Sequence, residues 1–132
     1  QRMIGVGKLD AHVRFTGVLN RDDMTWCYRN CSVFLMTSRV EACPNIALEA
    51  MGHGCLCVSS SNPPMPEIFK DTALYYPAGD AGALAQRVLH AFQLSDSQRK
   101  SIRRLAVARA AEFTWDACCD HTICELRKVL TR

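Results

Sequence analysis

Two apolar runs of strand length flank one short helix-forming segment, and this arrangement limits the folds open to the chain. The runs are CSVFLMTS (31–38) and CLCVSS (55–60), and neither alternates regularly between apolar and polar residues. Such continuous runs are typical of strands in a sheet that helices cover on both faces. Because a helix connects the two runs, the strands should be parallel and the crossover right-handed. The sequence therefore predicts an α/β fold built on a parallel sheet.

The rest of the chain continues this alternation, with short polar loops and no internal repeat. The other expected strands are 12–17 and 71–77, and the expected helices are 22–30, 44–53, a short turn at 66–71, 81–94, a basic helix from 95 or 96 and a final helix after 114. Their expected caps are Asp22 or Asn20, Asp80, Ser95 or Asp96, and Thr114, while Gly54 ends the helix 44–53. We expect one domain, with an irregular start (1–12), an α/β core (13–94) and C-terminal helices (95–132).

Composition narrows the class of protein further. Of the 132 residues, 48% are hydrophobic and 22% are charged, which is typical of a soluble globular domain. The apolar runs are much shorter than the roughly 20 residues that span a bilayer, and the start QRMIGVGKLD lacks the apolar region of a signal peptide. The sequence predicts a cytoplasmic protein.

Eight cysteines could indicate a disulfide framework, but their positions favour reduced thiols that act as small hydrophobic side chains. They form no C-x-x-C pair and have no regular spacing. His53, Cys55 and Cys57 could be considered as metal ligands. Because no second pair of ligands accompanies them, we expect no metal site.

The net charge of +3 hides an excess of basic residues near the end of the chain: residues 86–132 carry nine Lys/Arg and five Asp/Glu. The basic helix carries Arg99, Lys100, Arg103, Arg104 and Arg109 opposite an apolar face of Ile102, Leu105, Ala106, Ala110 and Phe113. We interpret the basic residues as a solvated face, with peripheral contact to an anionic membrane or an acidic partner as the alternative. No aromatic residues interleave with them, so nucleic-acid binding is not expected.

The segment SRVEACPNIALEAMGHG (38–54) holds the candidate site. Pro44 suits the first helical position, which leaves the backbone N–H groups of Asn45 and Ile46 pointing out of the helix start. This end of a helix carries a partial positive charge and attracts phosphate groups. The segment follows a strand of the parallel sheet, where ligands bind in such folds. It is therefore a candidate diphosphate site, approached from the loop 38–43.

Two glutamates flank this helix start. Asn45, Glu49 and His53 share a polar stripe, opposite a core-facing side of Ile46, Ala47, Ala50 and Met51. Glu49 could accept hydrogen bonds from the two hydroxyls of a ribose, and Glu41 could hold a further polyol such as a hexose. The alternative is structural: an acidic residue before a helix commonly interacts with the helix dipole, and a glutamate within one is ordinary.

These residues resemble the E-x7-E segment of retaining GT-B glycosyltransferases of family 4 (glycosyl transferases group 1), which includes bacterial mannosyl- and glucosyltransferases. VRFTG, CSVFLMTS, GCLCV, PEIFKDTALYYPAGD and FTWD follow the family's order, so the resemblance covers almost all of 13–116. It implies a Rossmann-like three-layer domain, the C-terminal, donor-binding domain of a two-domain enzyme. It also implies a nucleotide-diphosphate sugar as donor, with no metal or other cofactor.

On the matching positions, the resemblance implies that Glu41 contacts the sugar, Glu49 the ribose, and Asn45 and Ile46 the diphosphate. Cys43 and Ser38 belong to the same donor-binding segment. No residue here matches the Arg and Lys that neutralise the diphosphate in the family, and prolines stand where Gly-Gly commonly precedes a third glutamate, here Glu67.

The family's donor domain normally begins with two more strand-helix units, and an N-terminal domain precedes it. We therefore expect an N-terminally truncated domain with little activity alone. It could be a fragment of a full enzyme, a subunit of a split enzyme, or a binding module that kept the fold without catalysis. An incompletely covered sheet also favours a homo-oligomer.

Overall fold

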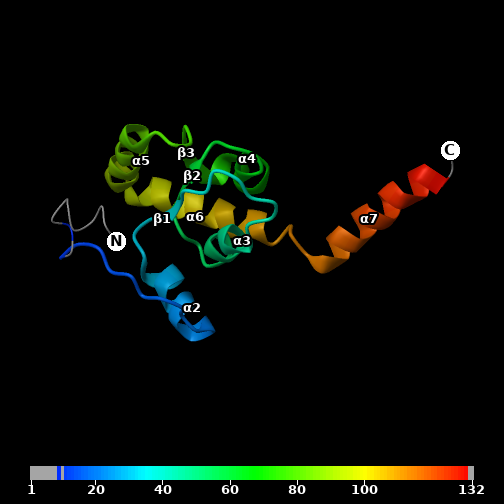
Figure 1. The fold of residues 1–132 in the computed structure, drawn as a ribbon, viewed down its shortest axis with the longest axis horizontal. Coiled ribbons are helices and arrows are strands. Elements are labelled where there is room, and N and C mark those ends of the chain that lie inside the picture. Colours follow the sequence, from blue (N-terminus) through cyan, green and yellow to red (C-terminus); the bar gives the residue numbers. More distant parts are fainter. Residues whose placement is uncertain (1–8, 10, 131–132) are drawn as a thin grey trace.

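Three parallel strands form the sheet of the computed structural model, which describes residue 9 and residues 11–130 (Figure 1). Their order is β1 (Phe34–Met36), β2 (Cys57–Ser60) and β3 (Ala73–Tyr76). Phe34 pairs with Cys57, which in turn pairs with Ala73. The expected α/β fold with a parallel sheet is confirmed.

Helices occupy most of the remaining described chain. They are α2 (Arg21–Asn30), α3 (Asn45–Gly52), α4 (Met65–Phe69), the 3₁₀ turn η1 (Lys70–Thr72), α5 (Ala81–Gln93), α6 (Asp96–Ala110) and α7 (Trp115–Leu130). None of the helices in the described ranges could cross a membrane.

Side chains cap these helices largely as the sequence predicts. Asn20, rather than Asp22, caps α2, since its side-chain oxygen accepts a hydrogen bond from the N–H of Asp23 at 2.9 Å. Asp80 and Thr114 cap α5 and α7 in the same way. Ser95 and Gln98 form a reciprocal capping box at the start of α6. Side chains near the helix starts therefore fix where α2, α5, α6 and α7 begin, whereas no side chain caps α3 or α4.

The alternation of side chains along residues 55–58, which lead into and begin β2, divides the core into two parts. Cys55 and Cys57 face one cluster, while Leu56 and Val58 face the other. The first cluster also contains residues of α2, α3, α4 and α6, and the second contains Ala91 of α5. Helices therefore cover both faces of the sheet, which confirms the three-layer prediction.

The predicted strand at 12–17 is wrong. Residues 13–17 form no strand, and the side chains of Val13 and Phe15 are 41% and 62% exposed. An extended segment becomes a strand only when a neighbour pairs with its backbone, and among the described residues no strand lies beside it. The outer edge of β1 is likewise unpaired within that part of the chain.

The interpretation of the basic helix as a solvated face is wrong for Arg99, Arg103 and Arg109, which are all half-buried. The Nε of Arg103 is buried and has no hydrogen-bond partner among the described residues. Arg99 donates hydrogen bonds to the carbonyls of Leu94 and Phe92 at 3.1 and 2.6 Å. Arg109 donates to the carbonyls of Ile68 and Glu67. The guanidinium groups of Arg99 and Arg109 therefore join α6 to neighbouring segments.

The apolar face of α6 is only partly buried. Ala106 is fully buried, and Ile102 and Ala110 pack against the two core clusters. Leu105 and Phe113, expected on the same face, are 44% and 41% exposed. The helix packs against α3, whose small residues allow a close approach.

Helix α7 extends away from the rest of the described chain (Figure 1). None of its residues is buried, although it carries apolar side chains such as Ile123, Leu126 and Val129. Its helical state was predicted correctly from the cap at Thr114.

Candidate functional site

The loop after β1 is anchored at the carboxyl edge of the sheet. Ser60, buried at the end of β2, donates a hydrogen bond from its hydroxyl to the carbonyl of Ser38 at 2.8 Å. Asn62 donates from its side-chain amide to the carbonyl of Arg39 at 3.1 Å. These bonds hold the start of the loop 38–43 beside the end of the neighbouring strand. The loop then leads directly into α3.

Helix α3 begins one residue later than the sequence predicts. Pro44 is buried and acts as the N-cap with φ −77° and ψ 90°, so Asn45 is the first helical residue. The carbonyl of Pro44 accepts the N–H of Ala47 at 2.9 Å. No side chain caps this end. The first N–H groups of α3, those of Asn45 and Ile46, have no acceptor within the helix and therefore remain available.

The exposure of α3 agrees with the predicted polar stripe at two of its three positions. Asn45 and Glu49 are exposed, whereas Ala47, Ala50 and Met51 are fully buried. His53 is half-buried instead of lying in solvent. The expectation for Ile46 is wrong, because this side chain is 42% exposed rather than facing the core. Ile46 thus lies at the open helix start.

Gly54 ends the helix as predicted. Its φ of +71° is in the left-handed region, which residues with a Cβ rarely adopt, and its N–H bonds to the carbonyl of Met51 at 2.9 Å. The turn directs the chain into Cys55 and β2. Helix α3 is therefore fixed at its carboxyl end by backbone geometry and at its amino end by the anchored loop.

The two glutamates of the candidate site have different surroundings. Glu41 lies half-buried in the loop 38–43, and no hydrogen bond to it occurs among the described residues. Glu49 accepts a hydrogen bond at its Oε2 from the hydroxyl of Tyr28, at 3.0 Å. Neither carboxylate forms an ion pair within the described part of the chain. Both therefore keep acceptor capacity for a ligand.

Tyr28 is a site neighbour that sequence reasoning missed. It comes from α2, 21 positions before Glu49, and its side chain is only 5% exposed. Burial raises the pKa of Tyr28, and the hydrogen bond to Glu49 raises it further. The ring stacks on His53 at a centroid distance of 5.4 Å. No local pattern could indicate a contact across this separation, because it depends on how α2 packs against α3.

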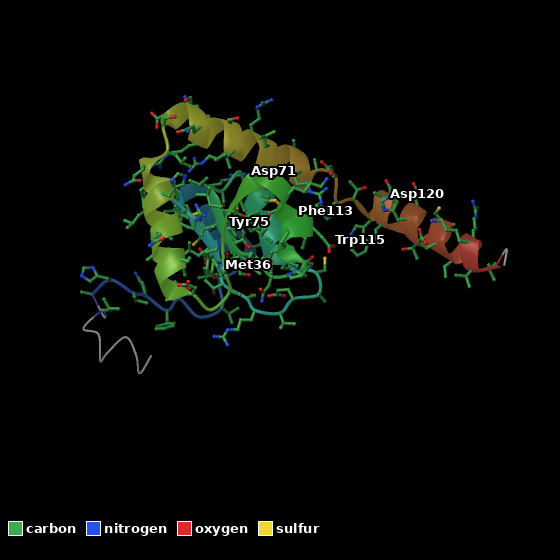
Figure 2. The ribbon with its side chains drawn as sticks, turned by 90° about the horizontal axis from the view of Figure 1, so that it is seen from above. Met36, Asp71, Tyr75, Phe113, Trp115 and Asp120 are labelled. Atoms are coloured by element: carbon green, nitrogen blue, oxygen red, sulfur yellow. The ribbon has the colours of Figure 1, made fainter. Side chains whose placement is uncertain are left out.

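A cavity of about 690 Å³ opens beside the start of α3. Cys43 and Asn45 line it from the candidate segment, and Arg109, Phe113 and Trp115 line it from α6 and the junction with α7. Figure 2 shows Phe113 and Trp115 at that junction. Ser38, Glu41, Ile46 and Glu49 are not among the residues that line it. The cavity therefore lies beside the start of α3, but it does not enclose all of the residues that the sequence predicts to bind the donor.

The eight cysteines are all free thiols, but they are not all small core residues. Cys55 and Cys57 are buried, whereas Cys43, Cys118, Cys119 and Cys124 are exposed. Burial raises the pKa of Cys55 to about 12, with Cys31 as a second cause at an Sγ–Sγ distance of 3.7 Å. Nowhere in the described ranges do three His, Cys, Asp or Glu residues gather in a way that could hold a metal ion.

The O-antigen chain mannosyltransferase B of Escherichia coli is 27% identical to this chain over 122 residues, which is 92% of this chain and 32% of that protein. The structure of sucrose-phosphate synthase from Thermosynechococcus elongatus matches with a TM-score of 0.79 at 22% identity, covering 98% of this chain and 33% of that one. The second match concerns the fold alone, a GT-B C-terminal-like domain. The chain thus spans about a third of the length of each relative.

Family assignment follows from a sequence match that covers most of the chain. The model of the family described as "Glycosyl transferases group 1" matches residues 1–93. This range includes the sheet, the loop 38–43 and all of α3. The chain therefore belongs to the group 1 glycosyl transferases.

Proposed function

We propose that this chain is the nucleotide-sugar-binding part of a glycosyltransferase that moves a hexosyl group from a nucleotide-diphosphate sugar to a glycan or lipid-linked acceptor. Family membership supports glycosyl transfer as the reaction class. One observation supports the donor site most directly. The start of α3, which no side chain caps, lies between two carboxylates in the sequence, those of Glu41 and Glu49. Neither carboxylate has an ion-pair partner in the described ranges.

Each part of the segment suits a different part of the donor. The N–H groups of Asn45 and Ile46, with the positive end of the helix dipole, would hold the diphosphate. The carboxylate of Glu49 would accept the two ribose hydroxyls, and that of Glu41 would accept sugar hydroxyls. Ser38 and Cys43 would border the donor from the loop.

The resemblance to the family also supports a retaining reaction that needs no metal ion, and we keep both as part of the proposal. As the bond to the sugar breaks, negative charge grows on the leaving diphosphate. Backbone donors fixed in advance at the start of α3 would stabilise that charge without having to reorganise.

We further propose that these 132 residues alone have little or no transferase activity. Glycosyl transfer needs an acceptor held against the donor in a cleft that excludes water. The chain spans about a third of its relatives, and the remainder of a relative would supply an acceptor domain or a separate subunit. A cytoplasmic location, with or without peripheral contact to a membrane, belongs to the same proposal.

Exposed apolar surface favours a second candidate, a subunit of a split enzyme or a non-catalytic binding module. Val13, Phe15 and Val18 expose 41%, 62% and 102% of their surfaces, and the edge of β1 is open among the described residues. Such surface commonly contacts another polypeptide or a second copy of the same chain. Sedimentation would test this candidate, because a mass above that of the single chain would show that a partner or a second copy covers this surface.

Calorimetry with GDP-sugars and UDP-sugars tests the donor proposal. We expect saturable binding that Glu49→Gln and Glu41→Gln each weaken about tenfold, which corresponds to about 1.4 kcal/mol. Glu125→Gln on α7 is the matched control, because Glu125 is exposed and lies outside the candidate segment. A folded protein that binds no nucleotide sugar at millimolar concentration would refute the donor site and favour the non-catalytic module.

A further inference from the structure

The hydrogen bond between Tyr28 and Glu49 joins two helices at the candidate site. Tyr28 lies in α2 and Glu49 in α3, and the Oη–Oε2 distance is 3.0 Å. The tyrosine is 5% exposed, whereas the glutamate lies on the exposed side of its helix. A buried donor is thus directed at the one exposed carboxylate that the proposed function assigns to the ribose.

The ring of Tyr28 is held from several directions. It stacks on His53 with an interplanar angle of 16°, and it meets Phe34 at a centroid distance of 6.0 Å and an angle of 59°. The thiol of Cys55 donates to the backbone carbonyl of Tyr28 at 3.1 Å. A donor fixed in this way loses little further freedom when a ligand binds.

The bond leaves Glu49 able to bind a diol. An ionised carboxylate offers about four acceptor positions on its two oxygens. Tyr28 uses one position on Oε2, and no other hydrogen bond to the Glu49 carboxylate occurs in the described ranges. A tyrosine hydroxyl is already protonated at neutral pH, and burial raises the pKa of Tyr28 further, so the hydroxyl remains a hydrogen-bond donor.

We propose that Tyr28 is a positioning residue, whose hydroxyl orients the Glu49 carboxylate to receive the two ribose hydroxyls of a nucleoside diphosphate. Without the bond, the exposed carboxylate would rotate freely and would have to be ordered when the ligand binds. The inference rests on the proposed function, since it assumes that Glu49 contacts a ribose. It adds a residue from α2 that lies outside the motif segment.

The test compares Tyr28→Phe with the unchanged 132-residue chain in binding GDP and UDP. Phenylalanine keeps the ring that contacts His53 and Phe34, so we expect the variant to fold. We expect its Kd for both nucleotides to rise three- to tenfold. The Kd for the 2′,3′-dideoxy analogues should not change, because they lack the hydroxyls that the oriented carboxylate receives. A purely structural role of Tyr28 would weaken both classes of ligand equally.

Tyr75→Phe is the matched control. Its hydroxyl donates to the carbonyl of Lys70 at 2.6 Å, and this bond involves no residue of the candidate site. We expect its Kd values to equal those of the unchanged chain. Glu49→Gln should weaken binding, and the double variant Tyr28→Phe/Glu49→Gln should bind no more weakly than Glu49→Gln alone, because Tyr28 acts through Glu49.

The outcomes separate this inference from the proposed function. Normal binding by Tyr28→Phe, together with weakened binding by Glu49→Gln, would overturn the inference and leave the function standing. No binding by the unchanged chain, or no effect of Glu49→Gln, would overturn both. Should Tyr28→Phe fail to fold by circular dichroism, 4-fluorophenylalanine incorporated at position 28 replaces it, because it keeps the ring and fills the place of the hydroxyl but cannot donate to Glu49. Equal changes in the Kd for ribose and dideoxyribose nucleotides, or no change in either, would then refute the inference.

Discussion

Arg109, near the end of α6, donates a hydrogen bond from its Nε to the backbone carbonyl of Ile68 at 3.0 Å. Its Nη2 donates to the neighbouring carbonyl of Glu67 at 2.6 Å. These carbonyls lie in the last turn of α4, where backbone acceptors have no partner within the helix. The guanidinium therefore caps α4 from a residue 41 positions away. It connects the end of α6 to the short helix that precedes β3.

Arg109→Ala should lower the free energy of unfolding by about 1.5–3 kcal/mol, because hydrogen bonds from a charged group are lost and carbonyls are left without a donor. Arg104→Ala is the matched control. Arg104 is exposed on the same helix, and we expect its replacement to change stability by less than about 0.5 kcal/mol. Urea denaturation followed by circular dichroism measures both. Equal stabilities of the two variants would contradict the capping role.

The ion pair of Arg109 with Glu112 should make stability depend on pH on the acidic side. The hydrogen bond from Arg109 lowers the pKa of Glu112 below its usual value of 4.5. A carboxyl with a lowered folded-state pKa contributes stability that is present above its unfolded pKa and is lost as pH falls through the folded value. Glu112→Gln should therefore lower stability at pH 7 more than at pH 3. A pH-independent difference in urea midpoint would contradict this.

The fold was predictable where local signals decide it. In the caps at Asp80 and Thr114, a side chain accepts a hydrogen bond from a backbone N–H three residues later. Because both groups lie close together in the sequence, a local pattern is enough to predict the cap. The apolar run at 55–60 correctly predicted a strand buried on both faces. The segment 12–17 looks equally strand-like, but pairing depends on a neighbour, which local sequence does not describe.

The candidate site was predictable only within one continuous segment. The exposed positions of Asn45 and Glu49 follow from helical periodicity. Tyr28 and Arg109 reach their partners across 21 and 41 positions, through packing of helices that no periodicity specifies. Helical periodicity also placed Ile46 on the core-facing side of α3, whereas its side chain is 42% exposed, because burial depends on tertiary packing as well as on periodicity.

Thiol reactivity should follow burial and not position in the sequence. The thiolate is the reactive form, and burial raises the pKa of Cys55 to about 12, so this thiol remains protonated and shielded. Iodoacetamide at pH 8 should modify the exposed Cys43, Cys118, Cys119 and Cys124 in the folded protein. Cys55 and Cys57 should react only in denaturant. Peptide mass spectrometry after timed quenching measures the order, and early modification of Cys57 would contradict the buried position of β2.

Two glycines at the end of α3 should respond in opposite directions to the same replacement. Gly54 has φ +71°, and an added Cβ would meet Cγ2 of Val107 at 3.5 Å, an ordinary contact. Gly54→Ala should therefore destabilise by about 1–2 kcal/mol through backbone strain and not through a clash. Gly52, two positions earlier, is the last residue of α3, and its added Cβ would lie 4.0 Å from Cβ of Ala110. Gly52→Ala should stabilise by up to about 1 kcal/mol, because alanine loses less backbone entropy in a helix.

Urea denaturation of these two variants gives a matched comparison, since both add one methyl group within the same turn of chain. A stabilised Gly54→Ala would show that the left-handed turn between α3 and β2 is not required. A destabilised Gly52→Ala would show that α6 lies closer to α3 than 4.0 Å allows. Opposite signs would confirm that backbone conformation at Gly54, which ends α3 and directs the chain into β2, contributes to stability separately from the packing of α3 against α6.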